Sequence, residues 1–165
     1  MGVQPTYLGD TILQKSFKVR PAPGLTPFRA VILDPVTTVP VGDDWLPPVK
    51  YPNHSFTALE TLLGVIIDPV SETSGALNVV AQNKFVTVRT HGVVPVMCDD
   101  TMATPILVND DVKSSNSAAG TQGMVAKAAR TGNVIDTAQH ILGVSWNKVT
   151  VNNRYALVKI QPQDL

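Results

Sequence analysis

The 165-residue sequence predicts an all-β fold: a small pseudo-duplicated β-barrel or β-tulip-like domain that follows an extended N-terminal arm. Three observations lead to this prediction. Val occurs 24 times and Thr 16 times, and β-branched side chains suit pleated strands better than helices. Pro (13) and Gly (11) divide the chain into short apolar runs. Several of these runs recur in the same order in the two halves of the chain.

Composition excludes several classes of function. Thirteen basic residues balance thirteen acidic ones, which argues against a protein that coats nucleic acid or an anionic membrane. No apolar run approaches the ~18 residues of a transmembrane helix, and the N-terminus shows no secretory signal. A single cysteine, Cys98, excludes an internal disulfide framework. We therefore expect a folded, soluble protein made in a reducing compartment, with neither nucleic acid nor membrane as a partner.

Residues 1–24 are interpreted as the arm. Apolar side chains are sparse there, and the segment ends in Pro21-Ala22-Pro23-Gly24, which cannot continue a helix or a central strand. Residues 16–20 alternate like a strand, with Phe17 and Val19 on one face. We expect the arm to extend away from its own core and to pack on neighbouring subunits. Deletion of residues 1–20 should then leave a folded body.

Residues 25–165 are predicted to form one β domain of two related halves, about 25–97 and 98–165. In the first half we expect strands at 30–33 and 62–67, a hairpin formed by 77–80 and 85–90, and a strand at 93–97. In the second half the corresponding segments are 105–108, 141–144, and a hairpin of 148–151 with 155–160. The offset between matching segments drifts around 75 residues, as a duplication with loop insertions would leave.

A Leu-Gly-Val sequence occurs once in each half, around Gly64 and Gly143. A glycine inside an apolar strand commonly marks a bulge or a close backbone approach, and small barrels need such points to turn corners. We expect a strand bend at both glycines. The predicted core of the closing hairpins consists of Phe85, Val86, Val88, Leu157 and Val158.

No catalytic, cofactor-binding or metal-binding set is predicted. His91 and Cys98 flank the strand at 93–97, so they should lie at its opposite ends, too far apart for a nucleophile and its base. Three Asp pairs begin at Asp43, Asp99 and Asp110; none fits a calcium-binding loop, and turn capping is the favoured interpretation. The sequence also contains no glycine-rich phosphate-binding motif.

The proline-rich loop at 42–53 carries Trp45 and Tyr51, with Phe56 just after it. Aromatic side chains on a rigid loop suit a protein–protein contact. They would equally suit a cover over the mouth of a small barrel, and the sequence leaves both interpretations open.

Several short motifs together resemble a known family. The first half begins with Pro27-Phe28-Arg29-Ala30-Val31-Ile32-Leu33-Asp34. Its Leu-Gly-Val strand is followed by a Val-x-Val-Arg run and then by His91-Gly92-Val93-Val94-Pro95-Val96. In this order of elements, residues 25–161 resemble the capsid cement, or head decoration, proteins of tailed bacteriophages. The loops at 42–53 and 113–123 depart from the family pattern.

The resemblance implies a structural virion protein that binds the outer surface of an assembled head and stabilises it. It implies the major capsid protein as partner, self-association as a homotrimer, contact between neighbouring subunits through the arm, and assembly in the host cytoplasm. It carries over no catalytic residue and no cofactor. The alternative is a carbohydrate- or host-surface-binding module of a virion, for which Trp45 and Trp146 are the discriminating residues. The side chains expected to contact partners are Tyr7, Leu8, Ile12, Phe17, Val19, Trp45 and Tyr51.

Overall fold

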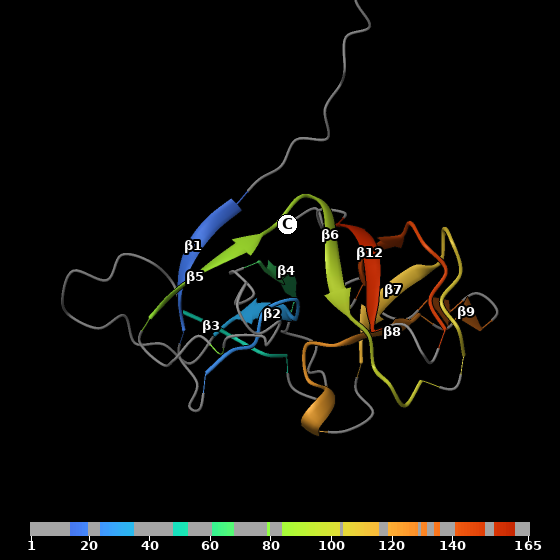
Figure 1. The fold of residues 1–165 in the computed structure, drawn as a ribbon, viewed down its shortest axis with the longest axis horizontal. Helices are drawn as coiled ribbons and strands as arrows, with labels where there is room; N and C mark the ends of the chain where they lie inside the picture. Colours follow the sequence, from blue (N-terminus) through green and yellow to red (C-terminus); the bar gives the residue numbers. More distant parts are fainter. Residues whose placement is uncertain are drawn as a thin grey trace, which may run out of the picture.

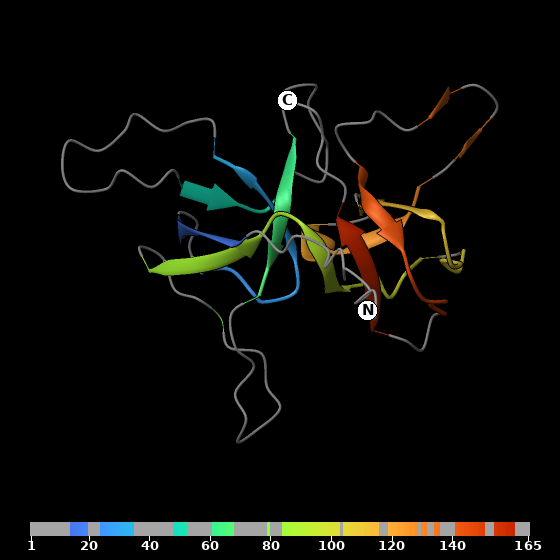
Figure 2. The ribbon, with the colours of Figure 1, turned by 90° about the horizontal axis from the view of Figure 1, so that it is seen from above.

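The structure is a computed structural model that describes residues 14–19, 24–34, 48–52, 61–67, 79, 84–102, 104–115, 119–128, 130–131, 134–135, 141–150 and 154–160. These residues confirm the all-β prediction, since besides strands they contain only a short 3-10 turn, η1 (Ala119–Thr121). Figure 1 shows two β units side by side, one built from β1 to β5 and the other from later strands. Figure 2 shows the same separation from above.

The first unit is a closed barrel with strand order β1-β3-β2-β4-β5. Its strands are β1 (Gln14–Val19), β2 (Ala30–Leu33), β3 (Pro48–Lys50), β4 (Leu62–Ile66) and β5 (Phe85–Arg89). The seam between β1 and β3 is parallel, whereas β1 and β5 pair in an antiparallel manner. The interior is filled by one side chain in two from each strand, as the pleat requires. These buried residues are Phe17, Val19, Leu25, Val31, Val49, Ile66, Val86 and Val88.

The second unit is a five-stranded sheet with order β6-β12-β11-β7-β8. Its strands are β6 (Gly92–Met97), β7 (Asp111–Ser114), β8 (Val125–Lys127), β11 (Ile141–Ser145) and β12 (Tyr155–Ile160). A parallel bridge between Cys98 and Val125 joins β6 to β8, so this sheet also curls back on itself. The short hairpin of β9 (Arg130–Thr131) and β10 (Val134–Ile135) pairs only with itself among the described strands.

The two units repeat one topology, which supports the predicted duplication. Strands β1, β2, β3, β4 and β5 correspond in order, partner and direction to β6, β7, β8, β11 and β12. Backbone hydrogen bonds repeat as well. In the first unit the Val19 amide donates to the Lys84 carbonyl, and in the second the Cys98 amide donates to the Arg154 carbonyl. Likewise, the bond from the Ile66 amide to the Arg29 carbonyl has its counterpart in the bond from the Ser145 amide to the Asp110 carbonyl. Even an unusual backbone angle recurs: Phe28 and Asn109 both have positive φ, 62° and 68°.

The structure corrects the predicted boundaries of the arm and the halves. Gln14–Val19 is a barrel strand that pairs with β5 and β3, so the arm does not include it. Phe17 is 5% exposed and Val19 is fully buried, because their alternating face points into the barrel. The halves divide between β5 and β6, near Thr90, rather than after residue 97. Removal of residues 1–20 would therefore take away a barrel strand.

Some segment pairings and core residues also differ from the prediction. The counterpart of β2 is β7, whereas Ile106, in the segment at 105–108, makes only an isolated bridge with Val149. Val86, Val88 and Val158 are buried as predicted. Phe85 and Leu157 are 58% and 42% exposed, because they lie on the outer face of strands whose other face forms the core.

Gly64 and Gly143 occupy matching positions, and the predicted bends are confirmed. A β-bulge or register shift occurs beside each of them in the pairing of β4 with β2 and of β11 with β7. A Cβ atom added at Gly64 would lie 2.3 Å from the carbonyl oxygen of Arg89. One added at Gly143 would lie 2.0 Å from that of Lys159. Both glycines are therefore required for close approach of the neighbouring strand.

The two units are joined by the segment Phe28-Arg29-Ala30, which leads into β2. The Phe28 carbonyl accepts from the amide of Met97 (2.7 Å), and its ring meets Tyr155 edge-on. The Ala30 amide donates to the Gly123 carbonyl (2.7 Å). The outer faces of β2 and β4 complete one apolar cluster with the second unit, to which they contribute Ala30, Ile32, Leu62 and Val65. The units thus share a core.

Candidate interaction surface

The residues predicted to contact partners fall into three groups. Tyr7, Leu8, Ile12 and Trp45 lie outside the described residues. Phe17 and Val19 are interior residues of the first barrel and cannot reach a partner, which corrects that part of the prediction. Tyr51 is used within the chain, as described next.

Tyr51 is half-buried at the joint between the units. Its hydroxyl oxygen accepts a hydrogen bond from the Thr26 amide, and the Arg29 guanidinium lies 5.4 Å from its ring centroid. The same guanidinium donates to the carbonyl oxygens of Gly120 (3.2 Å) and Gln122 (3.0 Å). The ring and the guanidinium together hold the η1 turn of the second unit against the first unit. Tyr51 therefore makes contacts within the chain that help to join the two units.

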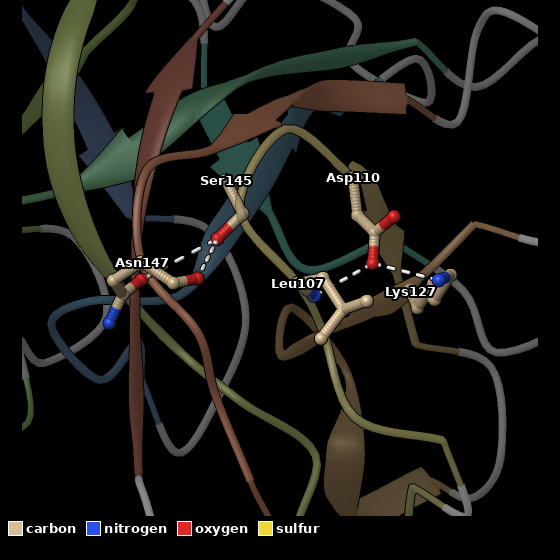
Figure 3. A network of polar contacts seen from close by, with 5 residues as sticks. All are labelled: Leu107, Asp110, Lys127, Ser145 and Asn147. Atoms are coloured by element: carbon tan, nitrogen blue, oxygen red, sulfur yellow. Dashed lines mark hydrogen bonds and ion pairs between the residues drawn. The ribbon is translucent and has the colours of Figure 1, made fainter.

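Figure 3 shows the corresponding place in the second unit, where Asp110 and Lys127 replace Arg29 and Tyr51. The Lys127 ammonium lies 2.8 Å from the Asp110 carboxylate, which also accepts from the Leu107 amide (2.7 Å). The same place therefore holds an ion pair in the second unit and a cation–π pair in the first. The bond to Leu107 confirms that Asp110 acts in a turn, as the sequence predicts.

The Asp99 carboxylate is buried and has a similar turn role. It accepts from the Thr101 amide (2.8 Å), from the Thr101 hydroxyl (2.6 Å) and from the Ser115 hydroxyl. The first two bonds cap the turn that follows Cys98, and the third ties this turn to the end of β7. In the part of the chain that the structure describes, no three His, Cys, Asp or Glu side chains gather to hold a metal ion.

Cys98 is a buried interior residue, and burial raises the pKa of its thiol to about 11. It lies just after β6, whereas His91 lies just before that strand, so the two occupy opposite strand ends as predicted. The Cys98 thiol is therefore protonated at neutral pH and shielded from solvent. None of the helical structure described is long and apolar enough to cross a membrane.

A prediction for reactivity follows from this thiol. A pKa near 11 instead of 9.0 lowers the thiolate fraction at pH 8 by about 100-fold, because at a fixed pH below the pKa each unit of pKa changes that fraction about tenfold. We expect alkylation of native Cys98 by iodoacetamide at pH 8 to be at least about 100-fold slower than in denaturant. The rate should rise as pH approaches 11, provided that circular dichroism shows the fold intact. Rapid labelling of the folded protein at pH 8 would contradict the burial.

One surface on which the described parts of the two units differ is a line of three side chains across β6, β12 and the end of β11. Pro95 pairs with Leu157, and the Trp146 amide donates to the Leu157 carbonyl (2.7 Å). All three point away from the core, since their strand neighbours Val94, Val96, Ala156 and Val158 are buried. We call Pro95, Leu157 and Trp146 the outer row. Trp146 is 50% exposed and Leu157 is 42% exposed.

The matching line in the first unit is smaller and more polar. Ser16 pairs with Thr87, and the Ile67 amide donates to the Thr87 carbonyl (3.1 Å), which repeats the outer-row geometry. Where the first unit has Ser16, Thr87 and Ile67, the second unit has Pro95, Leu157 and Trp146. The backbone does not require Pro and Leu at the first two positions, because the first unit builds the same strands with Ser16 and Thr87. At the third position both units carry a large apolar side chain, the partly buried Ile67 or the exposed Trp146. Exposed apolar side chains gathered in one place form a candidate interaction surface.

The outer row is held by polar contacts, part of which Figure 3 shows. The Ser145 hydroxyl donates to the Asn147 carbonyl (2.8 Å), and the Asn147 side-chain oxygen accepts from the Leu157 amide (2.8 Å). These bonds fix the turn that carries Trp146 beside β12. The Lys159 ammonium lies 5.7 Å from the Trp146 ring centroid and supports one side of the indole. The row is therefore a preformed apolar surface.

The predicted match of the closing hairpins makes Thr87 the equivalent of Leu157, and this change from a polar to an apolar residue is a signal for the row in the sequence. The prediction that Leu157 belongs to the core is wrong. In the structure Leu157 faces outward, because its neighbours Ala156 and Val158 on the same strand are buried. The sequence predicts a role for Trp146 only in the carbohydrate-binding alternative.

Comparisons with known proteins add no family. No protein-family model matches the chain, and no curated protein matches it.

Proposed function

We propose that this protein is a structural virion protein that binds the outer surface of an assembled phage capsid and stabilises it. The supporting observation is the outer row, in which Trp146 and Leu157 are exposed, whereas the first unit carries Ser16, Thr87 and the partly buried Ile67 at the same places. The resemblance of the ordered motifs to head decoration proteins supplies the partner, the major capsid protein. The chemistry of the row is that of a protein–protein contact, with an aromatic anchor supported by polar bonds beside it.

The proposed mechanism is the addition of contact area across subunit junctions of a finished shell. A ligand that binds only the assembled state stabilises it by RT ln(1 + [L]/Kd), about 2.7 kcal/mol per site at a hundredfold excess over Kd. Self-association as a homotrimer, also proposed here, would engage three surfaces at once and raise the effective concentration at each. Tyr7, Leu8, Ile12 and Trp45 are proposed as further contacts with capsid or neighbouring subunits.

The test measures co-sedimentation of the purified chain with preformed, undecorated heads. The variant Trp146→Ile/Leu157→Thr gives the second unit the side chains that the first unit carries at the same places. Loss of one or two apolar anchors of this size costs about 2–4 kcal/mol of binding, so we expect Kd to rise by about 30-fold or more. The matched control, Thr87→Ser in the first unit, should bind like the wild type. Binding should also survive moderate salt, because an apolar contact is little screened.

A second readout separates cementing from simple attachment. Heads heated with and without the protein should release their genome at different temperatures, with the decorated heads more resistant. If decorated and bare heads fail together, the cementing role is wrong. If the chain ignores heads but binds glycans or host cells through Trp146, the host-binding alternative replaces the proposal.

A further inference from the structure

We propose that copies of this chain associate end to end, with the turn at 107–109 of one copy placed against Phe85 of the next. The inference rests on the self-association within the proposed function and names the surfaces that make it. Its test uses no phage heads, so capsid binding and this contact can fail separately.

The joint between the two units of one chain shows the kind of contact that we expect. The turn at 26–28 of the first unit lies against the start of β12 in the second. The rings of Phe28 and Tyr155 meet edge-on, with their centroids 5.6 Å apart. Pro27 is buried there, and Phe28 and Tyr155 are half-buried. Each partner of this contact therefore has part of its apolar surface removed from water.

The turn at 107–109 is the counterpart, in the second unit, of the turn at 26–28. Asn109 has positive φ as Phe28 has, and the two turns lead into equivalent strands, β7 and β2. In the second unit, however, the apolar side chains of this turn face solvent, since Leu107 is 44% exposed and Val108 is 53% exposed. The second unit thus repeats the turn that makes the joint and leaves its apolar side chains exposed.

Phe85 is the counterpart of Tyr155. It opens β5 as Tyr155 opens β12, and it pairs with Lys18 as Tyr155 pairs with Met97. Phe85 is 58% exposed, whereas Tyr155 is half-buried in the joint. Figures 1 and 2 show that β5 begins at the edge of the first unit away from the second unit. The turn at 107–109 belongs to the second unit, so a second copy is needed to bring the two surfaces together.

The two surfaces carry opposite charges. Lys84 precedes Phe85 in the chain, and Lys18 pairs with Phe85 on β1. Asp110 and Asp111 follow the turn. Opposite charges beside an apolar contact steer the encounter and fix its register, whereas like charges repel. This arrangement therefore favours the turn of one copy against Phe85 of another over a contact between two turns.

The turn is preformed by hydrogen bonds, one of which Figure 3 shows. The Leu107 amide donates to the Asp110 carboxylate (2.7 Å), and the Asn109 amide donates to the last carbonyl of β11 (2.8 Å). Docking therefore costs little ordering of the backbone. We expect side chains to make the contact, because Lys18 pairs with Pro48 in its own barrel, where the joint has a backbone bond between the units.

A contact between two different surfaces of one chain either closes into a ring or continues as an open filament. The homotrimer proposed above is the closed form with three copies. In such a ring, joints within chains alternate with contacts between chains that use equivalent surfaces.

The experiment measures the molecular mass of the purified chain by analytical ultracentrifugation over a range of concentrations. We expect the wild type to form a trimer. Phe85→Ser and Leu107→Ser/Val108→Ser each remove apolar anchors from one surface, so each should weaken self-association by about 10-fold or more. The matched control is Leu33→Ser, which changes an exposed leucine of β2 outside both surfaces and should keep the wild-type mass. Circular dichroism should be unchanged in all three variants, because these side chains lie outside the cores.

Mixing the two variants tests that the contact joins different surfaces. The Phe85→Ser chain keeps its turn, and the Leu107→Ser/Val108→Ser chain keeps Phe85. An equimolar mixture should therefore form complexes of two chains that neither variant forms alone at the same concentration. A monomeric wild type would overturn the proposal. So would a mixture that stays monomeric, or a trimer that both variants leave intact.

Discussion

Removal of residues 1–20 should unfold the first unit, whereas removal of residues 1–13 should leave it intact. The longer deletion takes away β1, which closes the barrel between β3 and β5 and contributes Phe17 and Val19 to its core. Loss of two large buried side chains costs about 4–8 kcal/mol by the usual values for truncation in a core. Loss of the strand also exposes two edges of unpaired backbone. This total is comparable to the whole stability of a domain of this size.

The measurement is urea unfolding followed by circular dichroism and by the burial of Cys98. The 1–13 deletion should keep the midpoint and the slope of the wild-type transition. The 1–20 deletion should show no cooperative transition for the first unit or should aggregate. A 1–20 deletion that melts like the wild type would show that β1 is dispensable, in conflict with its place in the barrel.

The second large effect is expected at Gly143. A Cβ atom there would lie 2.0 Å from the Lys159 carbonyl oxygen and 2.8 Å from the Lys159 carbonyl carbon. Both are backbone atoms of the neighbouring strand, so no side chain can rotate away, and β12 must shift. Overpacking typically costs about 1–3 kcal/mol and occasionally more. We expect Gly143→Ala to lie at the upper end of that range and Gly143→Val beyond it.

A matched control comes from the same chain. Gly120 is exposed, and a Cβ atom there would meet nothing within 4 Å, so Gly120→Ala should change the free energy of unfolding little. Gly64→Ala should resemble Gly143→Ala, because it meets the Arg89 carbonyl oxygen at 2.3 Å in the same geometry. Thermal unfolding of the three variants measures the differences. Equal melting temperatures for Gly143→Ala and Gly120→Ala would refute the close approach.

The fold class, the repeated order of segments and the two glycine bends were predictable from the amino-acid sequence. These depend on local features, namely β-branched composition, recurring Leu-Gly-Val runs, and a glycine within an apolar strand, and each has a direct consequence for the backbone. Turn roles for Asp99 and Asp110 were also predictable, because an aspartate caps a turn through neighbours close in the sequence. So was the separation of His91 from Cys98, since a strand fixes the distance between its ends.

Which faces of the strands are covered depends on how distant segments pair and pack. Residues 14–19 look like part of an arm in sequence, but they form a barrel strand because they pair with β5, about 70 residues away in the chain. Tyr51 looks like an exposed loop aromatic until Arg29 and the η1 turn of the other unit come to lie beside it. Leu157 and Val158 are adjacent and similarly apolar, yet one faces solvent and the other the core. Strand pairing sets that choice, because a shift of one residue exchanges the two faces.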